Sequence, residues 1–262
     1  MDQMTKAFAL PILLIGLSLA ACNKKENAEQ PGNDVTQAQA ASPLTSAPID
    51  PATAAVIRGT VKFDGIPPKP REIDMSQDPA CKGSNQAETI VVENGALANV
   101  FVYMKAGLGN RTFEIPKEPA LLEQRGCKYH PHVLGLMAGQ TLDIKNEDMT
   151  NHNIHPSPQN NREWNESQPP SSPTLEKRFA REEIMLPVKC NQHPWMKMYI
   201  NVVKNPFFAV TDKAGKYEIK GLPPGDYTIA FVQEKLGERD QQVTVGPKET
   251  KTVDQSFKAA SE

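Results

Sequence analysis

The sequence has little net charge, few aromatic residues and no apolar run long enough to cross a membrane as a helix. Its 29 lysines and arginines are balanced by 31 aspartates and glutamates, and only 6% of its residues are Phe, Trp or Tyr. A protein that binds nucleic acid needs a concentrated basic surface, so we expect no nucleic-acid partner. The apolar stretch from Ala7 to Leu19 is shorter than the roughly 20 residues that a transmembrane helix requires.

Several catalytic signatures are also missing. The sequence has no HExxH segment, no glycine-rich phosphate loop and no recognisable Ser–His–Asp set. What it has instead is short apolar runs separated by Gly, Pro, Asn and Asp, with 23 prolines among 262 residues. This pattern is typical of an all-β protein, and the length allows one large domain or two ordinary ones.

The N-terminal segment resembles a bacterial lipoprotein signal peptide. Lys6 precedes the apolar stretch, which ends in Leu-Ala-Ala-Cys at residues 19–22. We expect the signal peptide, residues 1–22, to end at a lipidated Cys22; the alternative is an ordinary signal peptide with an unrelated cysteine. Asn23 stands where an aspartate would favour retention in the inner membrane. The expected location is therefore the bacterial cell envelope, on the periplasmic face, with a lipid anchor in the outer membrane.

Residues 23–52 are expected to form a disordered tether. They are rich in Asn, Glu, Gln, Ala, Pro, Ser and Thr and contain no aromatic residue. Such a segment cannot bury enough apolar surface to fold. A flexible chain of this length reaches about 30 Å, so the folded part would hang free of the membrane.

The cysteines leave one thiol unassigned. With Cys22 lipidated, Cys81, Cys127 and Cys190 remain in an oxidising compartment, where free thiols are unusual. Cys81 and Cys127 both lie in turn-like sequence, and we predict that they form a disulfide. Cys190 must then stay free, bind a metal or pair with another chain.

Two strands are predicted around the short loop that follows Cys190. Apolar residues alternate before this loop, which would place four side chains on one core-facing side of a strand: Ile184, Leu186, Val188 and Cys190. The alternation resumes after the loop, at Met196, Met198, Ile200 and Val202. The loop would therefore hold thiol, imidazole and thioether groups close together.

A second fragment adds another imidazole. Leu142 and Ile144 alternate along a predicted strand, and His152 and His155 follow it. Two imidazoles and a thiolate, with a weak axial thioether, define a blue-copper electron-transfer site. The sequence therefore predicts one type 1 copper ion as cofactor. Zinc fits less well, because structural zinc sites rarely use a thioether.

The segments NHNIH (151–155) and C-x2-H-x2-M (190–196) resemble the copper-binding segments of the cupredoxins. The segment HPWMK (193–197) is most similar to the corresponding segment of amicyanin. The resemblance covers roughly residues 120–204. It implies that His152, Cys190 and His193 are the equatorial copper ligands and that Met196 is the axial one. It also implies that Asn153 ties the first ligand segment to the cysteine loop.

Other residues remain as alternatives in this set. Met198 is the rival axial ligand, at the spacing of plastocyanin-like proteins. A binuclear copper site would need two cysteines in one loop, and that loop contains only Cys190. His155 is a candidate ligand although strand alternation turns it away from His152, and His130 with His132 could form an accessory copper site.

Residues 208–237 show a second pattern, in which turns at 212–215 and 221–225 separate alternating strands. This pattern resembles the carboxypeptidase regulatory-like module, a small immunoglobulin-like or transthyretin-like β-sandwich. Segments 59–68 and 98–105 resemble its earlier strands. We therefore expect a nested arrangement, in which residues 53–118 and 205–258 form this sandwich and residues 119–204 form a Greek-key cupredoxin sandwich. The alternative is two domains in series.

These features predict an anchored, periplasmic carrier of single electrons. Four protein ligands leave no open position for a substrate, so we expect no enzymatic activity. The partner would be a redox protein such as a c-type cytochrome or a periplasmic oxidoreductase, docking on Pro194 and Trp195 beside His193, which in cupredoxins reaches the surface. The alternatives are copper storage or delivery at the envelope, and a structural lipoprotein that has lost its metal.

Overall fold

The computed structural model describes residues 45–46, 48–83 and 85–259. Within these ranges the chain forms strands and turns and no helix, which confirms the all-β prediction for this part. The described residues accordingly include no helix with the length and apolarity to cross a membrane. The predicted signal peptide, Cys22 and most of the predicted tether lie outside these residues; near the end of the tether, strand β1 (Thr45–Ser46) pairs with β8 (Arg111–Thr112).

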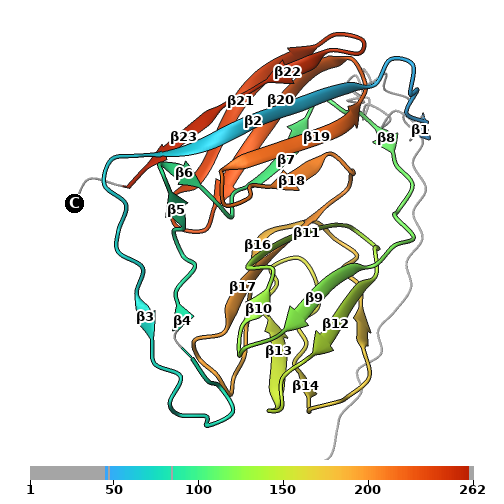
Figure 1. The fold of residues 1–262 in the computed structure, drawn as a ribbon. Helices are drawn as coiled ribbons and strands as arrows, with labels where there is room; N and C mark the ends of the chain where they lie inside the picture. The colour runs from blue at the N-terminus through green and yellow to red at the C-terminus, as the bar shows by residue number, and fades with distance from the viewer. Residues whose placement is uncertain (1–44, 47, 84, 260–262) are drawn as a thin grey trace, which may run out of the picture. The chain divides into compact units, whose positions relative to one another are not determined.

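One group of sheets, which we call the first body, combines strands from both ends of the described chain. Its sheets have the orders β18-β7-β20-β21 and β19-β2-β6-β5, and β22 and β23 also pair with β2 (Figure 1). The strands are β2 (Ala55–Asp64), β5 (Val92–Glu93), β6 (Ala96–Leu97), β7 (Phe101–Ala106), β18 (Phe208–Val210), β19 (Lys216–Leu222), β20 (Gly225–Gln233), β21 (Gly237–Val245), β22 (Thr250–Thr252) and β23 (Gln255–Lys258).

The second body consists of the strands that lie between these in sequence. Its sheets have the orders β10-β9-β12-β15 and β11-β17-β16-β13-β14. The strands are β9 (Ala120–Gln124), β10 (Tyr129–His130), β11 (Val133–Met137), β12 (Leu142–Asn146), β13 (His152–Pro156), β14 (Glu166–Gln168), β15 (Leu175–Lys177), β16 (Glu183–Lys189) and β17 (Lys197–Val203). Because β7 pairs with both β18 and β20, the sheets of the first body join strands that precede and follow the second body.

Alternating burial explains how these strands divide core from solvent. In β19 the side chains of Tyr217 and Ile219 are buried, whereas Lys216, Glu218 and Lys220 are exposed. The preceding turn closes with a hydrogen bond from the Gly215 amide to the Asp212 carbonyl. Gly215 has a φ of 69°, and a Cβ there would lie 2.4 Å from a backbone oxygen, so this turn requires glycine.

Strand β16 departs from the alternation that the sequence predicts. Its pairing with β17 shifts register between Glu183 and Leu186, and Met185 adopts a φ of 52°. This β-bulge turns Ile184 toward a cluster that contains Phe101, while Leu186 remains in the core of the second body. The prediction that Ile184 shares a face with Leu186, Val188 and Cys190 is therefore wrong for Ile184 and correct for the other three residues.

A small apolar cluster joins the two bodies. It combines buried side chains of β7 and β20 with others of β11 and β17: Phe101, Tyr103, Ala230, Val232, Val133 and Val203. Gly135, in β11, makes room for this contact, since a Cβ at that position would lie 2.7 Å from the ring of Phe208 and 2.8 Å from that of Phe101.

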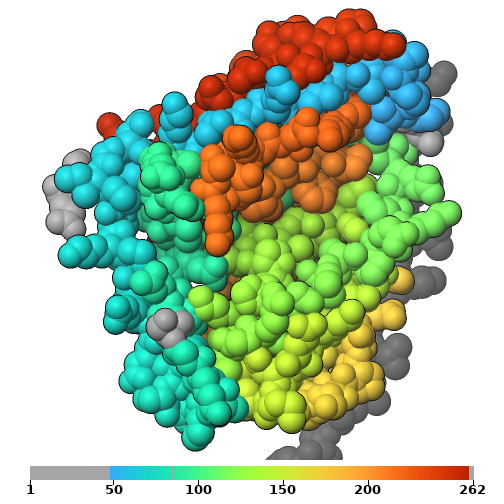
Figure 2. Space-filling model, in the orientation of Figure 1, coloured from blue at the N-terminus to red at the C-terminus, as the bar shows by residue number. Residues whose placement is uncertain are grey.

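The β3–β4 segment, which we define as residues 65–91, leaves the first body and packs against the second. It contains the short antiparallel pair β3 (Glu72–Ile73) and β4 (Asn85–Gln86). A disulfide joins Cys81 to Cys127, and Met75 lies in the core of the second body. In Figure 2 this segment, in turquoise, lies beside the green and yellow strands of the second body.

Candidate metal centre

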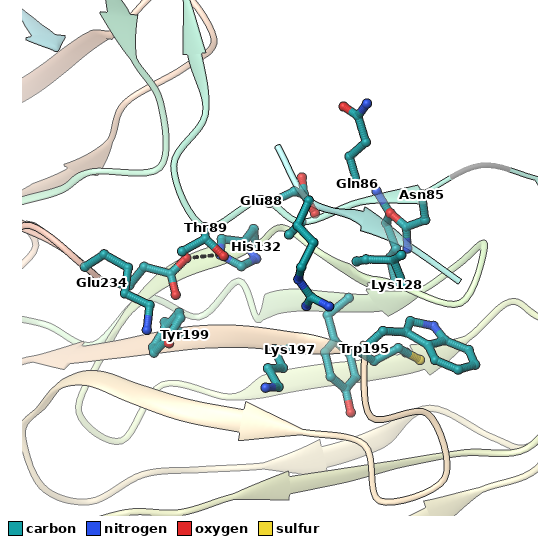
Figure 3. Close-up of a pocket in the computed structure, with 16 residues that line it drawn as sticks. Asn85, Gln86, Glu88, Thr89, Lys128, His132, Trp195, Lys197, Tyr199 and Glu234 are labelled. Atoms are coloured by element: carbon teal, nitrogen blue, oxygen red, sulfur yellow. Dashed lines mark hydrogen bonds and ion pairs between the residues drawn. The ribbon is translucent and has the colours of Figure 1, made fainter. Parts of the chain in front are cut away.

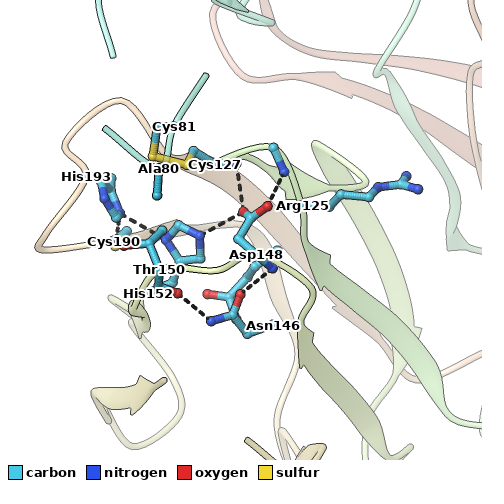
Figure 4. Close-up of polar contacts among 12 residues, drawn as sticks. Ala80, Cys81, Arg125, Cys127, Asn146, Asp148, Thr150, His152, Cys190 and His193 are labelled. Atoms are coloured by element: carbon cyan, nitrogen blue, oxygen red, sulfur yellow. Dashed lines mark hydrogen bonds and ion pairs between the residues drawn. A yellow bond between two sulfur atoms is a disulfide. The ribbon is translucent and has the colours of Figure 1, made fainter. Parts of the chain in front are cut away.

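Two histidines and the free cysteine meet at one end of the second body. His152 begins β13, Cys190 follows β16, and His193 lies in the loop before β17. Their ligand atoms all lie within 4.8 Å of one another: the two Nδ1 atoms are 2.9 Å apart, and Cys190 Sγ is 3.7 Å from His193 Nδ1. Figure 4 shows these three residues side by side. They are almost fully buried, with residue exposures of 0%, 2% and 4%.

The hairpin of β16 and β17 explains why Cys190 and His193 meet. Its loop is closed by a hydrogen bond from the Cys190 amide to the Met196 carbonyl, 3.2 Å, and by one from the Met196 amide to the His193 carbonyl, 2.9 Å. Strand β13 pairs with β16 on the other side, with His155 opposite Lys189. These pairings bring the first histidine to the end of the same sheet.

Both candidate thioethers are buried beside this loop. Met196 is 1% exposed and lies in the loop itself, whereas Met198 is 0% exposed and sits inside β17 opposite Val188. Met196 is therefore fixed by the same two backbone hydrogen bonds that shape the ligand loop. Met198 is one of the regularly alternating core residues of the strand.

Asn153 connects the two ligand segments. Its backbone amide donates to Cys190 Sγ at 3.5 Å, and its side-chain Oδ1 accepts a hydrogen bond from the Asn191 amide at 2.6 Å. Its Nδ2 donates in turn to Asn165. Asn153 thus restrains both the sulfur atom and the residue that follows it, which is the tie that the cupredoxin resemblance implies.

Asp148 contacts the outer ring nitrogen of His152, Nε2. Its Oδ2 lies 2.9 Å from His152 Nε2, so the inner Nδ1 is left to face Cys190 and His193. The same carboxylate accepts hydrogen bonds from the amides of Gly126 and Cys127, at 2.7 and 2.8 Å. Burial lowers the pKa of His152, which favours the neutral imidazole that binds metals.

Asp78 holds His193 in the same way and comes from outside the second body. Its Oδ2 lies 2.9 Å from His193 Nε2 and accepts a hydrogen bond from the Thr150 hydroxyl at 2.6 Å. The hydrogen bonds from Thr150, the Ala80 amide and His193 lower the pKa of Asp78 to about 2. The resemblance implied that His193 reaches the surface, but here the β3–β4 segment covers it.

Asp78 is part of this site but is not among the residues that the sequence patterns indicate. The available signal was indirect: Asp78 precedes Cys81 by three residues, and the predicted disulfide would bring that stretch to Cys127. The disulfide does form in the structure. Once Cys127 is placed beside Asp148, a carboxylate three residues from Cys81 is a natural candidate for the second histidine.

The other histidines lie apart from this cluster. His155 Nδ1 is 3.0 Å from Asn191 Oδ1 and its Nε2 is 2.6 Å from Glu163, while His130 Nε2 is 3.1 Å from the Arg125 carbonyl. His132 Nε2 faces Glu234 at 2.9 Å. Among the described residues, no group of potential metal ligands contains any of these three histidines.

Two further groups of potential ligands overlap the centre, and each includes a disulfide cysteine. They combine Cys81 with Asp78 and His193, and Cys127 with Asp148 and His152. A disulfide sulfur cannot act as a thiolate ligand. Within the described chain, the group of His152, Cys190 and His193 is thus the one whose donors suit a soft transition metal.

Trp195 and Pro194 lie next to His193 but differ in exposure. Pro194 is exposed, whereas Trp195 is half-buried and its Nε1 donates to the Cys127 carbonyl at 3.1 Å. The rings of Trp195 and His193 have centroids 5.0 Å apart. The tryptophan therefore packs directly on a residue of the centre and still contacts solvent.

Comparison with known proteins gives partial structural similarities only. No family model matches the chain, and no curated protein matches it. A copper-containing nitrite reductase from Thermus scotoductus SA-01 is 18% identical, over 39% of this chain and 25% of its own length, with a TM-score of 0.32. A purple cupredoxin from Nitrosopumilus maritimus is 22% identical, over 32% of this chain and 98% of its own, with a TM-score of 0.28.

A Cu(I) amicyanin variant is similar to the same extent. It is 19% identical, over 34% of this chain and 86% of its own length, with a TM-score of 0.29. Similarities of this size decide neither fold nor chemistry, and this chain spans only a quarter of the nitrite reductase. The residues of the centre are therefore the basis for assigning a function.

Proposed function

We propose that this protein is a type 1 copper protein that carries single electrons. The observation that carries the proposal is the convergence of two imidazole Nδ1 atoms and one thiol sulfur in a buried site, at distances of 2.9 and 3.7 Å. Met196 supplies a thioether in the same closed loop. This donor set suits copper in both of its oxidation states.

The chain's own residues support this role by holding the donors rigidly. Asp148 and Asp78 fix the two imidazoles through their outer nitrogens, and Asn153 restrains Cys190. A bound copper ion would supply the one-electron change between Cu(II) and Cu(I). A site that is fixed before the electron arrives needs little rearrangement in either state, and the low exposure of all three donors keeps water out.

The same geometry argues for a carrier rather than an enzyme. Two histidines, a cysteine and a methionine would occupy all positions of a trigonal site with an axial ligand, so no position is left for a substrate. We further propose that Cys22 carries a lipid and that this lipid anchors the protein at the periplasmic face of the outer membrane. Its partner would be a c-type cytochrome or a periplasmic oxidoreductase, approached through Trp195 and Pro194.

Copper delivery is the second candidate, and the burial of the centre weighs against it. A delivery site must hand its ion to an acceptor's ligands, which requires access to the metal. Cys190 is 2% exposed, and His193 lies beneath Asp78 of the disulfide-linked β3–β4 segment. A closed site of this kind favours retention of the ion.

Repeated redox cycling in the presence of a competing chelator separates the two functions. The copper-loaded protein would be reduced and reoxidised electrochemically while a strong Cu(I) chelator such as bathocuproine disulfonate is present. An electron carrier passes one electron per copper in each cycle and keeps its copper. Rapid loss of copper to the chelator on the first reduction would contradict the electron-transfer proposal and favour delivery.

A further inference from the structure

A hollow of about 310 Å³ opens beside the metal centre. Its walls come from the β3–β4 segment, from β10 and the start of β17, and from the turn that follows β20. Figure 3 shows Trp195, Lys128 and Lys197 on one side of it and His132, Tyr199 and Glu234 on the other. Met196 also lines the hollow, so the hollow extends to the ligand loop.

Four cationic side chains line this hollow, and none of them forms an ion pair with a described carboxylate. They are Arg71, Lys128, Lys197 and Lys235. None of the four side chains has a hydrogen bond or an ion pair within the part of the chain that the structure describes. By contrast, Lys105 and Lys177 elsewhere in the chain are paired with carboxylates at 2.7 Å.

The hollow has two carboxylates against these four cations, which leaves a formal excess of two positive charges in its lining. The Glu234 side chain is 6% exposed, and its Oε1 lies 2.9 Å from His132 Nε2. Burial and the neighbouring Glu234 carboxylate raise the pKa of the Tyr199 hydroxyl, so Glu234 also acts on this tyrosine. Glu88 is the remaining carboxylate of the lining. A cluster of unpaired cations on an accessible surface attracts anionic partners.

The hollow also offers a short path to the centre. Trp195 lines it, and the Trp195 ring centroid is 5.0 Å from that of His193. The other edge of His193 is closed by Asp78 at 2.9 Å. The half-buried tryptophan is thus an accessible group that touches a candidate ligand.

We propose that this hollow, which we call the cationic port, is the docking site for the acidic face of a redox partner protein, with Trp195 as the contact through which electrons reach His193. The electron-transfer part of this inference rests on the proposed function. The anion-binding part does not, because it follows from the charges of the lining alone.

The first test uses the two tryptophans of the chain as reporters. The full chain in non-ionic detergent micelles, without metal, would be labelled with ¹⁵N at the indole nitrogens and titrated with hexacyanochromate(III), an inert paramagnetic trianion. The expected result is broadening of the Trp195 indole signal at concentrations that leave Trp164 sharp. Trp164 is a strict control because a cation, Lys177, lies 4.9 Å from its ring but is paired with Glu166.

Charge-reversal variants test whether the four cations cause the effect. Arg71→Glu with Lys197→Glu should abolish the selective broadening of Trp195. The matched control, Lys62→Glu with Lys213→Glu, changes the net charge equally on exposed residues of the first body and should leave it unchanged. Equal broadening of both indoles, or broadening that survives the first double variant, would overturn the cationic port.

The second test distinguishes a protein partner from a small anion. The copper-loaded full chain would exchange electrons with an acidic and with a basic c-type cytochrome at low and high salt. Steering by the port predicts an advantage for the acidic cytochrome of about tenfold or more at low salt, lost at high salt and in the Arg71→Glu, Lys197→Glu variant. Selective binding of hexacyanochromate without this advantage would mean a small-anion site and would overturn the docking proposal. A failure of the proposed function would instead appear as absence of copper binding, with the first test unaffected.

Discussion

At the scale of single residues, both histidines of the centre carry a carboxylate on the outer ring nitrogen. Asp148 lies 2.9 Å from His152 Nε2 and Asp78 lies 2.9 Å from His193 Nε2. Such a carboxylate fixes the tautomer that presents Nδ1 to a metal and makes the imidazole a stronger donor. Because a stronger donor stabilises Cu(II) more than Cu(I), both aspartates should lower the reduction potential.

Asp78→Asn tests this effect at the histidine that the β3–β4 segment covers. The variant keeps the size of the side chain but removes its charge beside His193. We expect the affinity for Cu(II) to fall by about tenfold relative to Cu(I), which raises the reduction potential by about 59 mV. Direct electrochemistry of the copper-loaded protein measures this shift.

Asp74→Asn is the matched control for this substitution. Asp74 lies in the same segment and accepts a hydrogen bond from the Ser76 amide at 2.9 Å, not from a histidine. The reduction potential of the Asp74→Asn variant should equal that of the unmodified protein. An unchanged potential in Asp78→Asn, or an equal shift in both variants, would show that the contact with His193 does not set the potential.

The sequence predicts the candidate ligands better than it predicts the carboxylates that hydrogen-bond to them. Cys190, His193 and Met196 are close in sequence, so a single hairpin brings them together, and the sequence places His152 after the strand that contains Leu142 and Ile144. Asp78 lies more than a hundred residues from His193. A contact of that separation depends on the packing of a whole segment, which no local spacing encodes.

At the scale of elements, the β3–β4 segment is held to the second body by few regular hydrogen bonds. The strands among its described residues are β3 and β4, two residues each, and they pair with each other. The disulfide between Cys81 and Cys127, 46 residues apart, is therefore the main covalent link to the ligand region. The segment should depend on this link to keep Asp78 on His193.

Replacing both Cys81 and Cys127 with serine tests this dependence. Loss of a crosslink of this span should lower the free energy of unfolding by about 2–4 kcal/mol, measured by urea denaturation. It should also move the reduction potential in the same direction as Asp78→Asn, because the segment no longer holds the carboxylate in place. A variant that loses stability yet keeps the original potential would show that packing alone positions Asp78.

Strand β16 shows where periodicity fails as a predictor. The alternation that places Leu186, Val188 and Cys190 in one core holds in the structure, and the bulge at Met185 breaks it just before. The sequence around Met185 contains no glycine that would mark a bulge. The reason lies instead in the contact with the first body, which takes up the side chain of Ile184.

At the scale of the whole molecule, the contact between the two bodies depends on a position without a side chain. Gly135 has no Cβ, and the rings of Phe101 and Phe208 fill the space where one would lie. The sequence predicts strands at 98–105 and after the ligand loop, but it predicts neither β11, which contains Gly135, nor the contact itself. Which faces meet is decided by shape, and shape is not visible in the spacing of apolar residues.

Gly135→Ala should therefore destabilise the protein through crowding rather than through backbone strain. Overpacking of this kind costs about 1–3 kcal/mol, which thermal or urea denaturation detects. Gly246→Ala is the control, because a Cβ there would lie 3.5 Å from its nearest neighbour and meet no clash. Equal stability of the two variants would contradict the packing described for this contact.

The type 1 copper assignment is tested most directly by a visible absorption spectrum of residues 24–262 with one equivalent of Cu(II). A type 1 centre should give an intense blue or green charge-transfer band from the Cys190 thiolate to copper, and this band should be lost in Cys190→Ser. A colourless copper complex, or a band that survives Cys190→Ser, would contradict the assignment of a type 1 copper centre.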